Sequence, residues 1–230
     1  MLQGLVIENI ADLYKVEIDN IVYESKGRGK LKNNNECLLV GDIVEVEIVD
    51  KLQKKAVINN IIPRKTYIKR PKISNITQII LVVSCKNPKP DLLMLDKQLA
   101  FAEFNKIKPI IVLNKADLDI KQEFNKIREI YENIGYTVLI TEAKNKNGID
   151  KLKSILKDNI SVLSGNSGVG KSTLINDLFL DDITKEGEIS SKSKRGKNTT
   201  TSSKLYKLDS NTYIADTPRI FNFFYRRNRK

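Results

Sequence analysis

The sequence contains no histidine, no tryptophan and only two cysteines, Cys37 and Cys85. Structural zinc sites need several Cys and His side chains at short spacing, so these absences exclude such a site from the sequence. Two cysteines this far apart also give no disulfide framework. We expect both thiols to be buried and reduced, as in the cytosol.

Long apolar runs are missing as well. Segments such as residues 79–83 are far shorter than the roughly 18 to 20 residues that span a membrane. The first residues show no basic segment followed by a long apolar stretch, so no signal peptide is evident. We therefore expect a cytoplasmic protein with no membrane partner, acting as a monomer.

Acidic residues are outnumbered by basic ones. Forty Lys and Arg stand against 28 Asp and Glu, which gives a net charge of +12 over 230 residues. Such a balance favours a polyanionic partner, most simply nucleic acid. A lysine-rich, solubilising surface from a compositionally biased genome is the alternative, and charge alone favours neither. The length suffices for one large or two small domains.

Residues 1–65 alternate short apolar segments with turns. The pattern predicts strands at residues 4–8, 14–18, 21–24, 43–48 and 57–62. Five short strands in such a segment predict a small β-barrel of the OB type, a fold that often binds oligonucleotides. The basic turn residues Lys26, Arg28, Lys30 and Lys32 favour contact with RNA. An inert barrel is the alternative.

Residues 66–71 form a predicted linker, and an α/β domain is predicted over residues 72–218. Strand-like and helix-like segments alternate there, which indicates a largely parallel sheet flanked by helices. Strands are expected at 77–83, 110–113, 137–140, 161–163, 203–208 and 212–215, and helices at 92–104, 121–132, 148–157 and 172–179. Residues 219–230 are a basic, aromatic tail.

A phosphate-binding loop of the pattern G-x-x-x-x-G-K-[ST] lies between an apolar strand and a helix, as the motif requires. The predicted nucleotide contacts are Gly165, Asn166, Ser167, Gly168, Val169, Gly170, Lys171, Ser172 and Thr173. The glycines let backbone N–H groups surround the phosphates, and the helix N-terminus adds a favourable dipole. Lys171 would reach the terminal phosphates, and the Ser172 hydroxyl would bind Mg²⁺.

Upstream lies Asn114-Lys115-Ala116-Asp117, the N-K-x-D signature of guanine recognition. Asp117 would accept hydrogen bonds from the guanine N1–H and its exocyclic amine. Adenine lacks that amine, and would leave the carboxylate unpaired. Asn114 would orient the loop, and Lys115 would cover the base with its aliphatic stem. A P-loop ATPase with an incidental N-K-x-D is an alternative.

The order of the two motifs is unusual. In most GTPases the phosphate loop precedes N-K-x-D, and here it follows, which predicts a circularly permuted P-loop GTPase using GTP as substrate and releasing GDP. Asp216, after an apolar strand, fits a Walker-B role in holding Mg²⁺. The polar segment 190–201 suits a switch loop in which a threonine, taken as Thr200, closes on Mg²⁺. A disordered basic loop is its alternative.

These motifs and their order resemble the ribosome small-subunit-dependent GTPase A family (RsgA, also called YjeQ) over about residues 1–218. Further matches are Gly27-Arg28-Gly29-Lys30, Gly41-Asp42-Ile43-Val44, Arg64, Arg70-Pro71 and Arg195-Gly196-Lys197-Asn198-Thr199-Thr200-Thr201. The resemblance implies an OB-fold domain, a permuted GTPase domain and a role in late maturation of the small (30S) ribosomal subunit, with its 16S rRNA as partner. It also implies slow hydrolysis stimulated by the subunit, and it places Glu142 and Ala143 beside the guanine.

Three features depart from the family pattern. Asn198 stands where the family carries a His tied to hydrolysis, and Glu142 replaces the Ser of a Ser-Ala step. After Pro218 the chain has Arg219 instead of Gly, and the family's zinc domain is expected to be absent. The candidate catalytic residues are Lys171, Asn198 and Thr200. Two functions stay open, a GTPase of subunit maturation and a hydrolysis-impaired or truncated relative that docks on RNA without efficient turnover.

Overall fold

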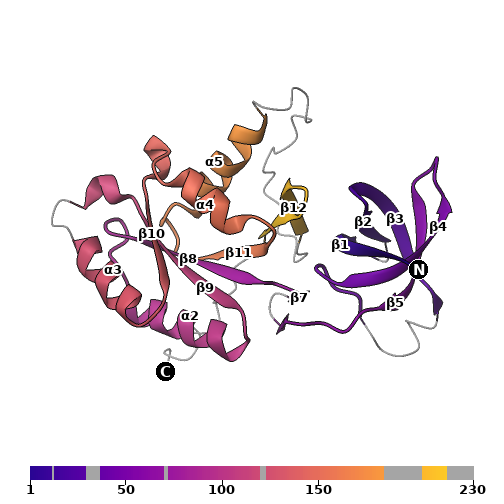
Figure 1. Cartoon of the computed structure of the whole chain (residues 1–230), viewed down its shortest axis with the longest axis horizontal. Coiled ribbons are helices and arrows are strands. Elements are labelled where there is room, and N and C mark those ends of the chain that lie inside the picture. Colours follow the sequence, from indigo (N-terminus) through magenta and orange to yellow (C-terminus); the bar gives the residue numbers. More distant parts are fainter. Residues whose placement is uncertain (12, 30–36, 70–71, 120–122, 184–203, 217–230) are drawn as a thin grey trace.

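The computed structural model of the chain describes residues 1–11, 13–29, 37–69, 72–119, 123–183 and 204–216. Of residues 180–183 and 216 it describes the backbone alone. A small barrel lies at one end of the molecule, and a sheet covered by helices lies at the other (Figure 1). These two parts confirm the fold class expected from the sequence.

The barrel is built from the first five strands. They are β1 (Leu2–Ile10), β2 (Leu13–Ile18), β3 (Ile21–Gly27), β4 (Ile43–Asp50) and β5 (Lys55–Ile61). The barrel closes because β1 pairs with β4 as well as with β2, and β3 pairs in parallel with β5. Alternate residues point inward, and Val6, Val16, Val44 and Ile58 are fully buried there. Their burial confirms the period-2 pattern read from the sequence.

A short hairpin follows the barrel, where the sequence predicted a linker. It consists of β6 (Tyr67–Lys69) and β7 (Lys72–Ser74). The fully buried carboxylate of Asp42 ties this hairpin to the barrel. It accepts hydrogen bonds from Arg64 Nε at 2.7 Å and from Ser74 Oγ at 2.6 Å. The sequence did not predict this hairpin, because its strands are too short to carry a periodic pattern.

The second part, here called the layered domain, holds the predicted six-stranded sheet. Its strands are β8 (Gln78–Ser84), β9 (Lys108–Asn114), β10 (Thr137–Thr141), β11 (Ile160–Ser164), β12 (Lys204–Asp209) and β13 (Thr212–Asp216). They lie in the order β10-β9-β8-β11-β13-β12. All neighbours are parallel except β12 and β13, which form an antiparallel hairpin.

Helices cover both faces of this sheet (Figure 1). They are α2 (Leu92–Phe104), α3 (Glu123–Asn133), α4 (Ile149–Leu156) and α5 (Lys171–Ile183), with 3₁₀ turns η1 (Ala116–Leu118) and η2 (Ala143–Asn145). Every residue of the central strand β8 is buried. Ile79 and Leu81 pack with α2 and α3, whereas Ile80 and Val82 pack with α4 and α5. Two apolar layers therefore hold the strand ends in fixed positions.

The barrel and the layered domain share a sheet. Glu8 of β1 pairs with Lys204 of β12, so eleven strands follow one another without a break. Leu5 and Ile7 of β1 also pack against the apolar cluster that contains Tyr213. The barrel is thus attached to the β12 edge of the layered domain.

The two cysteines differ from expectation in one respect. Cys85 is buried as predicted, but Cys37 is exposed, so the expectation that both are buried was wrong. In the part of the chain that the structure describes, no helix is long and apolar enough to cross a membrane. The same residues hold no group of three or more Cys, His, Asp or Glu side chains arranged for a metal ion.

Candidate nucleotide site

The predicted site residues follow the carboxyl ends of neighbouring parallel strands. Asn114 ends β9, Thr141 ends β10, and Ser164 of β11 leads directly into the phosphate loop. In parallel sheets these ends meet at one edge, where ligands of α/β proteins usually bind. The structure therefore brings together motifs that are about 50 residues apart in sequence.

The phosphate loop owes its shape to its glycines. Gly165, Gly168 and Gly170 all have positive φ angles, of 147°, 84° and 101°. A Cβ atom at Gly165 would lie 2.2 Å from the carbonyl oxygen of Val82, so the loop passes closer to β8 than any side chain permits. The loop then enters α5 at Lys171, and its phosphate contacts stay a prediction.

Lys171 is the first residue of α5, and its side chain folds back over the loop. Its Nζ donates to the carbonyl oxygens of Gly165 at 2.7 Å and of Asn166 at 2.9 Å. Burial lowers the pKa of this ammonium group, because an apolar surrounding disfavours the charged form. The positive charge is thus held at the loop, where the motif places the terminal phosphates.

Asn114 connects three loops through one buried amide. Its Nδ2 donates to the carbonyl oxygen of Val169 in the phosphate loop at 3.0 Å. Its Oδ1 accepts from Thr141 Oγ1 at 2.9 Å and from the backbone N–H of Ala143 at 3.2 Å. The side chain is only 1% exposed, so each lost hydrogen bond would leave an unsatisfied polar group. Asn114 thus links the N-K-x-D motif to the phosphate loop and to the Ala143 turn, and its role toward a nucleotide stays a prediction.

Lys115 makes a second bridge to the phosphate loop. Its backbone is left-handed, with φ of 65°, and its Nζ donates to the carbonyl oxygens of Asn87 at 2.7 Å and Gly168 at 2.6 Å. The thiol of Cys85 donates to the Lys115 carbonyl oxygen at 3.1 Å. The Lys115 side chain therefore links the N-K-x-D motif to the phosphate loop, and its contact with a base stays a prediction.

Asp117 lies on the turn η1 and is exposed. Among the described residues its carboxylate has no hydrogen-bond or ion-pair partner, whereas the neighbouring Asp119 caps α3 by accepting from the backbone N–H groups of Glu123 and Phe124. Two aspartates in one turn thus have different roles. Asp119 stabilises the start of α3, whereas the Asp117 carboxylate is exposed to solvent.

The Glu142–Ala143 step lies beside the N-K-x-D motif. Ala143 is buried and donates to Asn114, but the Glu142 carboxylate is used within its own loop. Its Oε2 accepts from Asn147 Nδ2 at 2.7 Å and from Asn145 Nδ2 at 3.3 Å. The Glu142 side chain therefore closes its own turn, and the contact of this step with a guanine base stays a prediction.

The candidate metal ligands are described in part. Ser172 and Thr173 are exposed in the first turn of α5. Asp216 is the last residue of β13, whose parallel neighbour β11 leads into the phosphate loop. Asn198, Thr200 and Arg219 lie outside the described residues.

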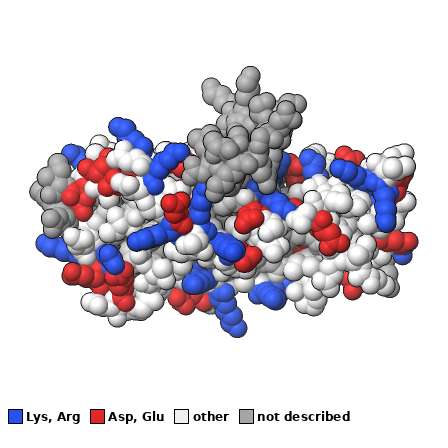
Figure 2. Space-filling view, turned by 45° about the horizontal axis from the view of Figure 1, so that its top comes forward, with Lys and Arg blue, Asp and Glu red and all other residues white. Residues whose placement is uncertain are grey.

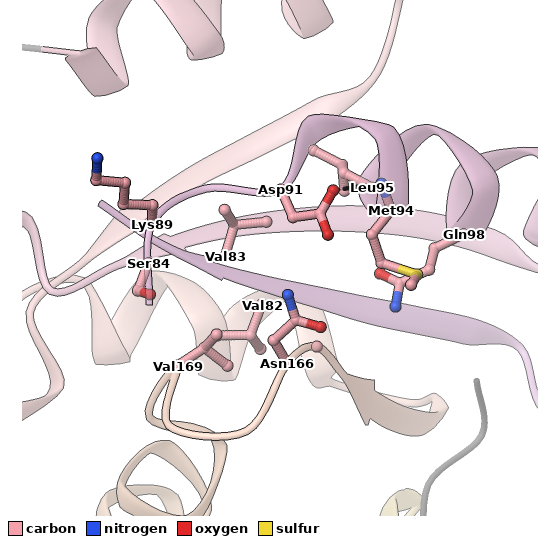
Figure 3. Close-up of a pocket in the computed structure, with 11 residues that line it drawn as sticks. Val82, Val83, Ser84, Lys89, Asp91, Met94, Leu95, Gln98, Asn166 and Val169 are labelled. Atoms are coloured by element: carbon pink, nitrogen blue, oxygen red, sulfur yellow. Dashed lines mark hydrogen bonds between the residues drawn. The ribbon is translucent and has the colours of Figure 1, made fainter. Parts of the chain in front are cut away.

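A small pocket adjoins the phosphate loop on the side of α2 (Figure 3). Figure 3 shows Met94, Leu95 and Gln98 of α2 around it, with Asp91 from the N-cap of that helix, Asn166 and Val169 from the phosphate loop, and Ser84 from the end of β8. Gln98, 4% exposed, donates from Nε2 to Ser164 Oγ at 3.3 Å. Sequence reasoning missed Gln98 and Thr141. A polar residue within an apolar helical or strand pattern was the available signal for both.

Comparison with known proteins gives one consistent result. The RsgA GTPase family profile matches residues 61–225, and the RsgA N-terminal domain profile matches residues 3–58. The chain is 41% identical over 218 residues to the small ribosomal subunit biogenesis GTPase RsgA of Alkaliphilus metalliredigens, covering 95% of this chain and 75% of that protein. The protein of that name from Clostridium acetobutylicum is 42% identical over 217 residues, covering 94% and 74%.

Solved structures show the same likeness. The crystal structure of YjeQ from Thermotoga maritima superposes with a TM-score of 0.81 at 33% identity, covering 96% of this chain and 76% of that one. YloQ, described as a circularly permuted GTPase, superposes with a TM-score of 0.75 at 29% identity, covering 96% and 72%. Both structures therefore share the fold of this chain over nearly its whole length.

Proposed function

The chain belongs to the RsgA GTPase family, and from this membership we propose that it binds GTP between the N-K-x-D motif and the phosphate loop, hydrolyses it to GDP and phosphate, and acts in the biogenesis of the small ribosomal subunit. The barrel, residues 1–65, is the RNA-binding part, and residues 72–218 form the GTPase domain. The protein acts as a cytoplasmic monomer, and its RNA partner is the 16S rRNA.

One observation carries the nucleotide assignment, namely the buried amide of Asn114. It holds the guanine motif, the Ala143 loop and the phosphate loop together through three hydrogen bonds. A base and a phosphate chain bound by the two motifs therefore belong to the same ligand. The free carboxylate of Asp117 supports guanine over adenine, since guanine alone supplies the two donors that such an acceptor needs.

Mg²⁺ is the proposed cofactor. Ser172, Thr200 and Asp216 would hold it, and hydroxyl and carboxylate oxygens are the donors that Mg²⁺ prefers beside nucleotide phosphates. The position of Ser172 at the start of α5, directly after the lysine that contacts the loop, supports this role. When bound, the ion neutralises charge that develops on the phosphates during hydrolysis. Lys171 contributes a second positive charge.

Asn198 favours a second candidate function, a nucleotide-binding module with weak turnover. An amide can hydrogen-bond a water molecule, but it cannot act as a general base near neutral pH. Both candidates share the nucleotide site and differ in hydrolysis rate and in its stimulation by subunits.

Single-turnover GTP hydrolysis with and without purified small subunits separates the two candidates. Strong stimulation supports the GTPase of subunit maturation, and weak, unstimulated turnover that rises in Asn198→His supports the binding module. Competition of ADP against a fluorescent GDP analogue tests the base. Equal competition by ADP and GDP would contradict guanine recognition and favour an ATPase.

A further inference from the structure

A buried carboxylate of the barrel contacts the layered domain. Glu17 of β2 is 7% exposed, and its Oε1 accepts hydrogen bonds from Lys207 Nζ on β12 and from the hydroxyl of Tyr213 on β13, the latter at 3.1 Å. Lys207 Nζ also donates to Asn20 Oδ1 at 2.6 Å. Both strands of the β12–β13 hairpin are therefore tied to one side chain of the barrel.

A second barrel carboxylate contacts the same hairpin closer to its start. Glu8 Oε1 pairs with Lys204 Nζ at 2.9 Å, and Glu8 Oε2 pairs with Lys15 Nζ at 2.8 Å. Glu8 and Lys204 are also backbone partners in the sheet. The barrel thus contacts β12 at two points, Lys204 and Lys207.

The hairpin ends at the candidate Mg²⁺ ligand. β13 pairs with β11 from Tyr213 to Ala215, and this pairing does not extend to Asp216. The backbone partner of Asp216 is Lys204 of β12, the residue that Glu8 contacts. The position of Asp216 therefore depends on β12, and β12 is in turn held by the barrel.

The contact of Glu17 with Lys207 and Tyr213 is buried and closely packed. Tyr213 is 7% exposed, and the ammonium group of Lys207 lies 5.9 Å from the centre of its ring. Burial, followed by the charge of Glu17, raises the pKa of the Tyr213 hydroxyl, which stays protonated and able to donate. A buried carboxylate that loses such partners is left uncompensated. A shift of the barrel against the β12–β13 hairpin would therefore disturb the hydrogen bonds of Glu17 with Lys207 and Tyr213.

We propose that Glu17, although it belongs to the barrel, is a positioning residue of the nucleotide site. Through Lys207 and Tyr213 it sets the hairpin that presents Asp216 to the Mg²⁺ bound with the nucleotide. The inference rests on the proposed function, because it assigns regulation of that site to the barrel. A partner that binds the barrel and moves Glu17 would therefore also move Asp216.

The test measures the affinity of the full chain for fluorescent GDP with and without Mg²⁺. We define the Mg²⁺-dependent gain as the ratio of GDP affinity with Mg²⁺ to GDP affinity without it. In Glu17→Ala this gain should fall by about fivefold or more, because coupling between linked sites typically changes affinity by at least that factor. Affinity without Mg²⁺ should stay unchanged. The charge swap Glu17→Lys with Lys207→Glu should recover part of the loss. Hydrogen exchange over residues 204–216 should rise in Glu17→Ala and fall again in the swap.

Two further variants make the test decisive. Glu47→Ala removes a barrel carboxylate from an exposed ion pair with Arg28, and it should leave the Mg²⁺ dependence as in the unaltered chain. Tyr213→Phe keeps the buried ring and removes only the hydroxyl that donates to Glu17, so it tests this contact even if Glu17→Ala does not fold. It should lose part of the Mg²⁺-dependent gain.

Two results would overturn the inference. One is an unchanged Mg²⁺-dependent gain in both Glu17→Ala and Tyr213→Phe. The other is an equal loss of affinity with and without Mg²⁺, which indicates a merely structural role. An unaltered chain that binds no GDP would refute the proposed function together with this inference. Binding of GDP with unchanged Mg²⁺ dependence in the variants would refute this inference alone.

Discussion

At the scale of single residues, the site depends on side chains that bind the protein as well as those left for the ligand. Asn114 makes three hydrogen bonds to its own chain, whereas Asp117 makes none among the described residues. The N-K-x-D pattern predicted both positions. It could not predict Thr141 as a partner of Asn114, because that contact joins residues 27 positions apart and depends on strand order.

Asp117→Asn should change the preferred base. The amide can donate to the oxygen that xanthine carries in place of the guanine amine, so affinity should shift from GDP toward XDP. Competition of both nucleotides against fluorescent GDP and fluorescent XDP measures the shift. Asp150→Asn, an exposed aspartate in the first turn of α4, is the control and should change neither affinity. A variant at position 117 that keeps full preference for GDP would contradict the role of this carboxylate.

Gly170→Ala should weaken nucleotide binding. An added Cβ would lie 2.3 Å from Asn114 Nδ2, so the bridging amide must move. We expect a loss of GDP affinity of about tenfold, comparable to the loss of one or two hydrogen bonds.

Gly135→Ala is the matched control for Gly170→Ala. Its φ of 96° is close to the 101° of Gly170, and no atom lies within 4 Å of the added Cβ. Both variants share a backbone strain of about 1 to 2 kcal/mol, measurable as a lower free energy of unfolding. If both variants bind GDP equally well, the Asn114 contact has no part in binding.

At the scale of elements, the sequence predicted long periodic segments and missed short contacts. Strand β8 was evident from its uninterrupted apolar run, because both of its faces are covered by helices. The hairpin of β6 and β7 was not predicted, since each strand has three residues and its place depends on the buried Asp42. The pairing of β1 with β12 was also beyond the sequence, because it joins opposite ends of the chain.

The contact between β1 and β12 should weaken in acid. Burial of Glu8 alone would raise its pKa, but the hydrogen bonds and charges of Lys15 and Lys204 outweigh burial and lower it. A carboxyl whose pKa is lower in the folded state adds stability above its ordinary pKa and loses it as the pH falls through the lowered value.

Glu8→Gln should therefore reduce the free energy of unfolding at neutral pH, and the difference from the unaltered chain should shrink as the solution becomes acidic. Urea unfolding at several pH values measures both. A difference that stays constant from neutral pH into acid would show that these ion pairs do not stabilise the fold.

At the scale of the whole molecule, the net charge of +12 is spread widely. Figure 2 shows Lys and Arg side chains interspersed with acidic ones over the visible face, without a single continuous basic stripe. The excess charge therefore predicts attraction to a polyanion but does not locate its binding surface. This is why the sequence supported an RNA partner and a solubilising surface equally well.

Binding to small subunits should weaken steeply with salt, because counterions released from RNA phosphates dominate the electrostatic part of the affinity. Replacing both Lys26 and Arg28 by Gln should reduce the slope of log affinity against log salt by about one for each cation that contacts a phosphate. The same change at two exposed lysines, Lys151 within α4 and Lys157 directly after it, is the matched control. Equal slopes for both pairs would count against the barrel as the RNA-binding surface.

The strand order also sets a sequence of events during synthesis. Strands β8, β9 and β10 leave the ribosome before the phosphate loop, and Glu17 cannot contact Tyr213 until that residue, 196 positions later, has been synthesised. Strands β8 to β10 pair with one another and pack against α2 and α3, and all of these elements precede β12 in the chain, so they can associate while β12 is still untranslated. We therefore expect ribosome-bound chains stalled just before β12, with β11 already synthesised, to protect β8 to β10 from proteases, and the barrel to dock only once β12 and β13 emerge.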